Sequence, residues 1–234
     1  MTLLGYLFGN VAANDLTTTT AFRRWFGDSQ VLDEKGKPLV VWHASGPKTD
    51  VFDAFDVERA FDIGMHFGTL DAATTFEGVP QPYFLKIERP LLLIDPGDWL
   101  ETGRRTSTIG QLLTLGFADE QTYSRISTLR DERKNMLKIQ GGKGEGWLRE
   151  SNDPVAVEWR SLRAMVGREI AAVLRRAGYD GVVYENTVEG GTSWMVLEPT
   201  QIKSADRNNG AFDPKDSSFL RGGDFAGVQR KRKP

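Results

Sequence analysis

Residues 156–177 constrain the fold more than any other stretch, because they carry the strongest helical period in the chain. Gly178 supplies a stop signal directly after them. The apolar stripe of this helix consists of Trp159, Leu162, Val166, Ile170, Val173, Leu174 and Ala177. The β-prone runs around it are short and do not alternate regularly with helices, which disfavours a Rossmann sheet. No GxGxxG or GxxxxGKS/T phosphate loop is present either. We therefore predict the α+β class.

Turn residues separate the short β-prone runs and predict where the strands lie. The run KGKP (35–38) stands between two of them and indicates a hairpin, whose second strand ends at or just before His43. A short strand is expected at 65–67. The clearest strand signal is PYFLKIERPLLLI (82–94), which Pro90 interrupts.

The middle and the ends of the chain differ from this pattern. Residues 97–154 are polar with a helical period at 120–139, which is typical of an insertion that carries helices. We predict one domain over residues 21–205, preceded by an N-terminal lead-in (1–20). A flexible C-terminal tail (206–234) follows, because that stretch has too few apolar residues to order itself.

Composition excludes several classes of function. The chain has no cysteine, so disulfides, zinc ribbons and thiol nucleophiles are excluded, and with only two histidines we predict no metal site. The net charge of -2 gives no global polyanion-binding signature, and the basic run RKRK (230–233) is interpreted as a solvated tail. The N-terminal apolar run lacks a basic flank, and no run approaches the ~20 apolar residues of a membrane span. We expect a soluble, cytoplasmic protein without a membrane partner.

Three segments favour a functional site when they are taken in order. The first is VVWHASG (40–46), in which a strand delivers His43 to a run of small residues. Alone, such a histidine is as well explained by a structural hydrogen bond. The second is DIGMHFGTLDAATTF (62–76), a glycine-led strand with a short helix. The third is VEGGTSWMVLEPTQIKSA (188–205), a glycine-rich loop that holds a carboxylate and precedes a strand.

This order of motifs resembles the ADP-ribosyltransferase superfamily, and within it the His–Tyr–Glu branch of diphtheria toxin and the poly(ADP-ribose) polymerases. The chain is similar to the ADP-ribosyltransferase-like domains in polyvalent proteins of phages and mobile elements. The resemblance covers roughly residues 21–96 and 155–216. It implies a split antiparallel β-sheet core with flanking helices and an inserted helical segment. It also implies NAD as substrate and no metal.

The resemblance carries over residue by residue. His43 matches the histidine that bonds the adenosine ribose of NAD. Ala44 stands where the family usually has glycine, whose backbone holds the nicotinamide amide, and Ser45 matches a residue that bonds the same amide. His66 stands where the family has its tyrosine, and Phe76 matches the aromatic residue that stacks on nicotinamide. The implied NAD-binding set is His43, Ala44, Ser45, Phe67, Phe76 and Ser193.

The catalytic acid is the weakest match to the family. Ser193 occupies the position at which the polymerases have their glutamate. We favour Glu189 instead, because a glycine-flanked loop can fold a carboxylate back over the strand end, and we place Glu185 second. The implied catalytic set is Glu189, His43 and His66, with His43 acting by positioning.

The resemblance implies transfer of ADP-ribose from NAD to a macromolecular acceptor. That acceptor is a protein or a nucleic acid. The resemblance further implies that this chain acts as a phage or bacterial toxin or effector, delivered into a host cell. Two alternatives stay open. Ser193 and His66 favour a non-catalytic binding module that keeps the fold without the acid. An NAD glycohydrolase, with water as acceptor, is the other.

Overall fold

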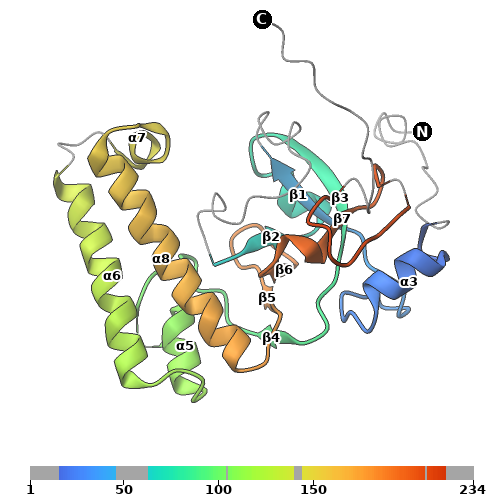
Figure 1. Cartoon of the computed structure of the whole chain (residues 1–234), viewed down its shortest axis with the longest axis horizontal. Coiled ribbons are helices and arrows are strands. Elements are labelled where there is room, and N and C mark those ends of the chain that lie inside the picture. Colours follow the sequence, from blue (N-terminus) through green and yellow to red (C-terminus); the bar gives the residue numbers. More distant parts are fainter. Residues whose placement is uncertain (1–15, 46–62, 104, 140–143, 209, 220–234) are drawn as a thin grey trace, which may run out of the picture.

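The computed structural model of the chain describes residues 16–45, 63–103, 105–139, 144–208 and 210–219. Two β-sheets lie between helix α3 on one side and a group of helices on the other (Figure 1). All strand pairs but one are antiparallel. The α+β class with a split, mainly antiparallel core is therefore confirmed. Within the ranges described, no helix is long and apolar enough to cross a bilayer.

The first sheet has three antiparallel strands in the order β1-β3-β7. Their bounds are Val41–Ser45 for β1, Val79–Leu85 for β3 and Ile202–Ser204 for β7. Helix α3 (Thr20–Phe26) covers the outer face of this sheet, where the rings of Phe22 and Phe84 meet edge to face at 4.9 Å. The Thr19 side chain caps α3 by accepting a hydrogen bond from the Phe22 N–H.

The second sheet has four strands in the order β2-β6-β5-β4. Their bounds are Met65–Phe67 for β2, Pro90–Leu92 for β4, Gly181–Glu185 for β5 and Thr192–Val196 for β6. The strand predicted at 65–67 is confirmed by β2. The predicted run 82–94 is divided between two strands in different sheets, but the break lies at residues 86–89, and Pro90 is the first residue of β4.

Alternation along the strands divides the core into layers. Trp194 and Val196 of β6 face the cluster between the two sheets, whereas Met195 faces the helices. In β3, Leu85 faces the other sheet and Phe84 faces α3. Each sheet is therefore buried on both faces, and successive side chains of one strand serve different layers.

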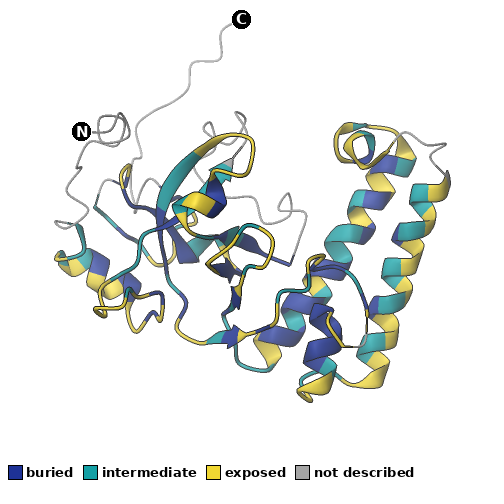
Figure 2. Cartoon of the chain, turned by 180° about the vertical axis from the view of Figure 1, so that it is seen from behind, coloured by how far each residue is buried: buried dark blue, intermediate teal, exposed yellow. Residues whose placement is uncertain are grey.

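The helices pack against the outer face of the four-stranded sheet (Figure 2). Their bounds are Leu70–Ala73 for α4, Thr108–Thr114 for α5, Glu120–Ile139 for α6, Gly144–Glu150 for α7 and Pro154–Arg176 for α8. Of these helices, α4 lies close to β1 and α7 packs on α8, whereas α5, α6 and α8 contribute side chains to the core on the sheet. The helix predicted at 120–139 is confirmed by α6, and the helix predicted at 156–177 by α8, which begins two residues earlier behind the Asp153 cap. Ile109 and Ile126 join one core with Val182 and Met195.

The predicted tail boundary at residue 206 is wrong. Phe212 is 1% exposed, and its ring packs edge to face on Phe22 at 5.0 Å. The buried ammonium of Lys203 donates to the carbonyls of Asp216 and Ser218 at 2.7 and 2.6 Å, and burial lowers its pKa. Two aromatic anchors and this lysine order a stretch that is poor in apolar residues as far as Phe219, which is also buried. The remainder of the predicted tail lies outside the described residues, as does the lead-in before residue 16.

Candidate functional site

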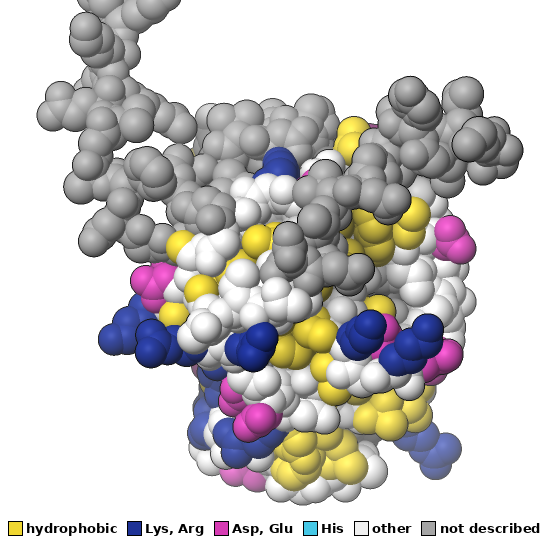
Figure 3. Space-filling model, turned by 90° about the vertical axis from the view of Figure 1, so that its right-hand side faces the viewer, with side chains coloured by type: hydrophobic (Ala, Val, Ile, Leu, Met, Phe, Trp, Pro, Cys, Tyr) yellow, Lys and Arg dark blue, Asp and Glu magenta, His cyan; other side chains and the backbone are white. Residues whose placement is uncertain are grey.

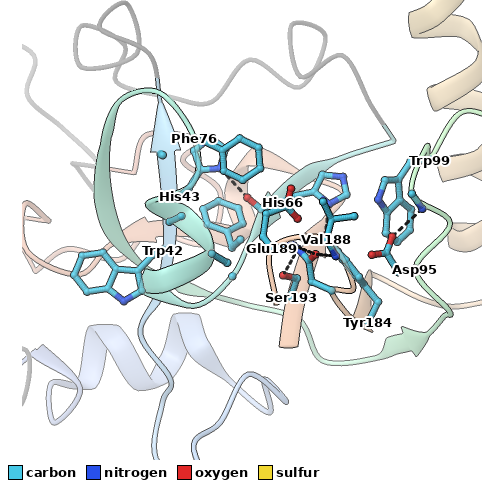
Figure 4. A pocket seen from close by; sticks show the side chains of 17 residues that line it. Trp42, His43, His66, Phe76, Asp95, Trp99, Tyr184, Val188, Glu189 and Ser193 are labelled. Carbon is cyan, nitrogen blue, oxygen red and sulfur yellow. Dashed lines mark hydrogen bonds between the residues drawn. The ribbon is translucent and has the colours of Figure 1, made fainter. Parts of the chain in front are cut away.

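In the described part of the chain, one β-bridge joins the two sheets where β1 and β2 diverge. Trp42 and Gly68 exchange two backbone hydrogen bonds there, at 2.9 and 3.0 Å. A pocket of about 370 Å³ opens beside this bridge (Figure 4). All predicted site residues except Ser45 line it: His43, Ala44, His66, Phe67, Phe76, Glu189 and Ser193. Ser45 ends β1, but its side chain lies outside the described part of the structure.

His43 reaches the pocket from β1 and has a defined tautomer. Its Nδ1 lies 2.7 Å from the backbone carbonyl oxygen of His66 on β2. Since a carbonyl can only accept, Nδ1 carries the proton, and Nε2 has the lone pair of the neutral ring. Burial lowers the pKa of His43, an effect that the bond to the His66 carbonyl partly offsets. His43 is therefore neutral near pH 7 and can accept a hydrogen bond from a hydroxyl at Nε2.

His66 belongs to an aromatic group on the opposite wall of the pocket. Its Nδ1 lies 2.9 Å from the Tyr184 hydroxyl, and its ring lies 5.1 Å from that of Trp99. Trp99 and Tyr184 meet edge to face at 4.7 Å. This wall therefore contains a phenol, although the position that the sequence resemblance assigns to a tyrosine holds histidine. Trp99 comes from the segment that we predicted to be an insertion.

Phe76 borders the pocket beyond the short helix α4. It is 55% exposed, which is unusual for a phenylalanine, whereas the other aromatic residue of this motif, Phe67, is buried. Phe76 therefore lines the pocket with a largely solvent-accessible ring.

Glu189 lies in the loop between β5 and β6 and lines the pocket. Asn186 shapes this loop, because its side-chain oxygen accepts the N–H groups of Val188 and Glu189 at 3.0 and 2.9 Å. Gly190 and Gly191 both have positive φ, and a Cβ on Gly191 would come 2.9 Å from the Thr69 methyl. Among the described residues, none forms an ion pair or hydrogen bond with the Glu189 carboxylate.

Glu185, the second candidate acid, faces away from the pocket. Consecutive residues of β5 point to opposite sides, and Tyr184 takes the pocket side. The Glu185 carboxylate accepts a hydrogen bond from the Thr192 hydroxyl at 2.8 Å and lines a separate apolar groove with Leu92 and Ile94. The structure therefore separates two carboxylates that are only four positions apart in the sequence.

Ser193 lies on the floor of the pocket and is almost fully buried. It pairs with Tyr184 across β5 and β6, and its hydroxyl accepts a hydrogen bond from the Asn186 amide at 3.2 Å. The position that the sequence resemblance assigns to the catalytic acid thus holds a small hydroxyl group, which is hydrogen-bonded to the loop carrying Glu189.

Sequence reasoning missed Asp95, Trp99 and Tyr184. Asp95 follows β4 and lines the pocket, and its side chain accepts both the backbone N–H and the hydroxyl of Thr187. The available signal was a carboxylate directly after an apolar strand. That signal points to a site only once β4 is known to pair in parallel with β5. Within the described ranges, no three metal-ligating side chains gather into one group.

The chain belongs to the family described as ADP-ribosyltransferase in polyvalent proteins, whose model matches residues 33–212. A comparison with curated proteins finds no match. A comparison with solved structures finds the crystal structure of an anti-CRISPR protein, with 16% identity over 68% of this chain and 89% of the other. Its TM-score of 0.25 is too low to indicate a shared fold.

Proposed function

We propose that this chain cleaves NAD at the bond between nicotinamide and ribose and transfers ADP-ribose to a macromolecular acceptor. We assign it to the His–Tyr–Glu branch of the superfamily, with His66 in place of the tyrosine. One observation carries the proposal: His43, His66, Phe76 and Glu189 come from three separate segments and line one pocket. Membership of an ADP-ribosyltransferase family supports it.

The reaction needs negative potential beside a ribose and no redox partner. The bond from ribose C1′ to the nicotinamide nitrogen breaks, its electron pair leaves with neutral nicotinamide, and positive charge develops on the ribose. A lone pair of the acceptor then forms the new bond to C1′, and the acceptor loses a proton. A carboxylate placed at the ribose stabilises such a cation, as carboxylates do in glycoside hydrolysis.

Glu189 supplies this carboxylate in our proposal. It borders the pocket, and no described residue competes for its charge. The hydrogen bond from its own N–H to Asn186 fixes the backbone that carries it. An acid on a glycine-rich loop thereby takes the role that the family gives to the residue at the position of Ser193.

The remaining residues hold NAD in our proposal. Neutral His43 accepts a hydrogen bond from the adenosine ribose at Nε2, and the backbone of Ala44 and the hydroxyl of Ser45 hold the nicotinamide amide. Phe76 stacks on the nicotinamide ring from the rim of the pocket, and Phe67 packs beneath His43, with ring centroids 5.3 Å apart. These contacts bend NAD and orient its reactive bond.

The nature of the acceptor belongs to the proposal as well. On the side of the molecule seen in Figure 3, the described cationic side chains are interspersed with anionic and apolar ones and form no continuous basic surface. Nucleic acid is bound largely through a continuous basic surface, which the described residues on this face do not form, and we keep both a protein and a nucleic acid as acceptors. The family name supports a role in a polyvalent protein, and we propose that the chain acts as a toxin or effector in the cytoplasm of a host cell.

One observation favours a second function. Ser193 stands at the family's acid position, so a binding module that holds NAD or ADP-ribose without cleaving it is the alternative. The two functions differ in one measurement, the release of nicotinamide from NAD.

The test is incubation of the purified chain with adenine-labelled NAD and a bacterial lysate, which is then split into protein and nucleic-acid fractions. Release of nicotinamide together with label in one fraction supports the transferase. Release without label in either fraction means an NAD glycohydrolase. Saturable binding without any release means the binding module.

A further inference from the structure

The loop that carries Glu189 is held at its other end by a residue from a distant part of the chain. Asp95 follows β4, and its Oδ2 accepts the Thr187 N–H at 3.0 Å and the Thr187 hydroxyl at 3.1 Å. Its Oδ1 accepts the Gly97 N–H at 2.9 Å. Bonds to a charged acceptor are the stronger kind of hydrogen bond. A single carboxylate therefore ties the β5–β6 loop to the segment after β4.

The bonds to Asp95 connect the loop to another part of the chain, which the hydrogen bonds within the loop do not do. Asn186 closes the loop upon itself through Val188, Glu189 and Gly190, but those bonds move with the loop as a unit. Among the described residues, the hydrogen bonds that connect the loop with other parts of the pocket are the one from Asn186 to Ser193 and the two from Thr187 to Asp95. Two successive glycines with positive φ would otherwise let the Glu189 end vary in position.

We propose that Asp95 is a positioning residue, which holds Thr187 so that Glu189 faces the ribose. This inference rests on the proposed function of Glu189. A direct electrostatic role for Asp95 is the rival. Three of the roughly four lone-pair positions of its carboxylate are already used by N–H and O–H donors of the protein, which favours positioning over contact with substrate.

Positioning predicts a particular kinetic pattern. Displacement of Glu189 by a fraction of an ångström weakens stabilisation of the transition state more than binding of NAD. Asp95→Asn should therefore lower turnover roughly 10–100-fold and change KM for NAD less than about threefold. Thr187→Val, which removes only the hydroxyl bond, should lie between this variant and wild type, and Thr187→Ser should restore turnover.

A double-mutant cycle with Glu189→Gln separates the two roles of Asp95. If Asp95 acts through Glu189, the variant carrying both Asp95→Asn and Glu189→Gln should match Glu189→Gln within about twofold. Equal losses from Asp95→Asn in both backgrounds would overturn positioning and make Asp95 an independent electrostatic group. The control is Asp98→Asn, because Asp98 caps the Leu100 N–H in a similar local turn outside the pocket and should leave turnover unchanged.

A second readout does not depend on catalysis. Hydrogen–deuterium exchange of residues 186–191 in the full chain should be faster in Asp95→Asn than in wild type. It should be unchanged in Asp98→Asn, with residues 156–176 protected in all three as a check on folding. If wild type releases no nicotinamide, the proposed function fails. Hydrogen–deuterium exchange alone then decides whether Asp95 holds the loop in place. Unchanged exchange at 186–191 in Asp95→Asn would overturn the positioning role.

Discussion

The imidazole of His43 donates its Nδ1–H to the backbone carbonyl of His66 across 2.7 Å, and this bond joins the two sheets at the mouth of the pocket. It runs beside the only bridge between β1 and β2 that the described residues form. The side chain proposed to bind NAD therefore also closes the gap between the sheets, and substitutions of His43 should affect both properties.

We expect His43→Ala to raise KM for NAD about 3–10-fold, which is the loss of one hydrogen bond to a neutral group, on the order of 0.5–1.5 kcal/mol. His43→Asn is the matched control, because its amide N–H can still donate to the His66 carbonyl while the acceptor at Nε2 is gone. Steady-state kinetics should show a raised KM in both variants. Urea unfolding should show a higher free energy of unfolding for His43→Asn than for His43→Ala. A wild-type KM in the Ala variant would remove His43 from the site.

The depressed pKa of His43 makes stability depend on pH. The unfolded chain takes up this proton near pH 6.5, whereas the folded chain takes it up only at lower pH. The unfolded state thus binds more protons below pH 6.5, and the protein loses stability as the pH falls through this range. The slope from one such group is at most about 1.4 kcal/mol per pH unit. Wild type should therefore lose more unfolding free energy than His43→Asn between pH 7.5 and 5, and parallel losses would contradict the assignment.

Glu189→Gln should keep the fold and the affinity for NAD while lowering turnover roughly 10²–10³-fold, because the lost interaction is strongest in the transition state. Glu185→Gln is the matched control, since that carboxylate lies on the other side of β5 and should have little effect. Nicotinamide release and acceptor labelling measure both. Wild-type turnover in Glu189→Gln together with an inactive Glu185→Gln would move the acid to Glu185. If both variants behave as wild type, no loop carboxylate takes part.

Two phenylalanines offer a direct comparison of stability. Phe212→Ala should cost about 3–5 kcal/mol, because it empties a fully buried site against Phe22 and Trp25. Phe76→Ala, at a residue that is 55% exposed, should cost less than about 1 kcal/mol yet weaken NAD binding about 3–10-fold through lost stacking. Chemical denaturation measures the first effect and KM the second. Similar unfolding free energies for both variants would contradict the packed position of Phe212.

Hydrophobic periodicity and turn residues were sufficient to predict much of the fold from the sequence. Helix α6 has the predicted bounds, because its apolar positions recur at helical spacing, and β2 follows from the short run between Gly64 and Gly68. Residues 206–219 were wrongly predicted to be flexible, because a low average content of apolar residues does not reveal single side chains that become buried. Phe212 and Lys203 each gain their order from partners that only the tertiary structure brings near.

The pocket was only partly predictable for a related reason. His43, His66 and Glu189 lie in motifs that can be read along the chain. Asp95 and Tyr184 reach the pocket because β4 and β5 pair in parallel, and no local pattern specifies that pairing. Trp99 comes from the polar segment that we interpreted as a helical insertion, and its ring packs against the aromatic rings of Tyr184 and His66.

The alternation of Tyr184 and Glu185 on β5 has a consequence for how this pocket can change. Which of the two faces the cavity depends on the pairing of Tyr184 with Ser193. A one-residue slip of β5 would exchange their places. A single deletion near Gly181 could thus replace a phenol with a carboxylate, without any substitution in the pocket itself. Insertions and deletions in this hairpin, more than point changes, are therefore the mutations that would exchange the chemistry of the pocket.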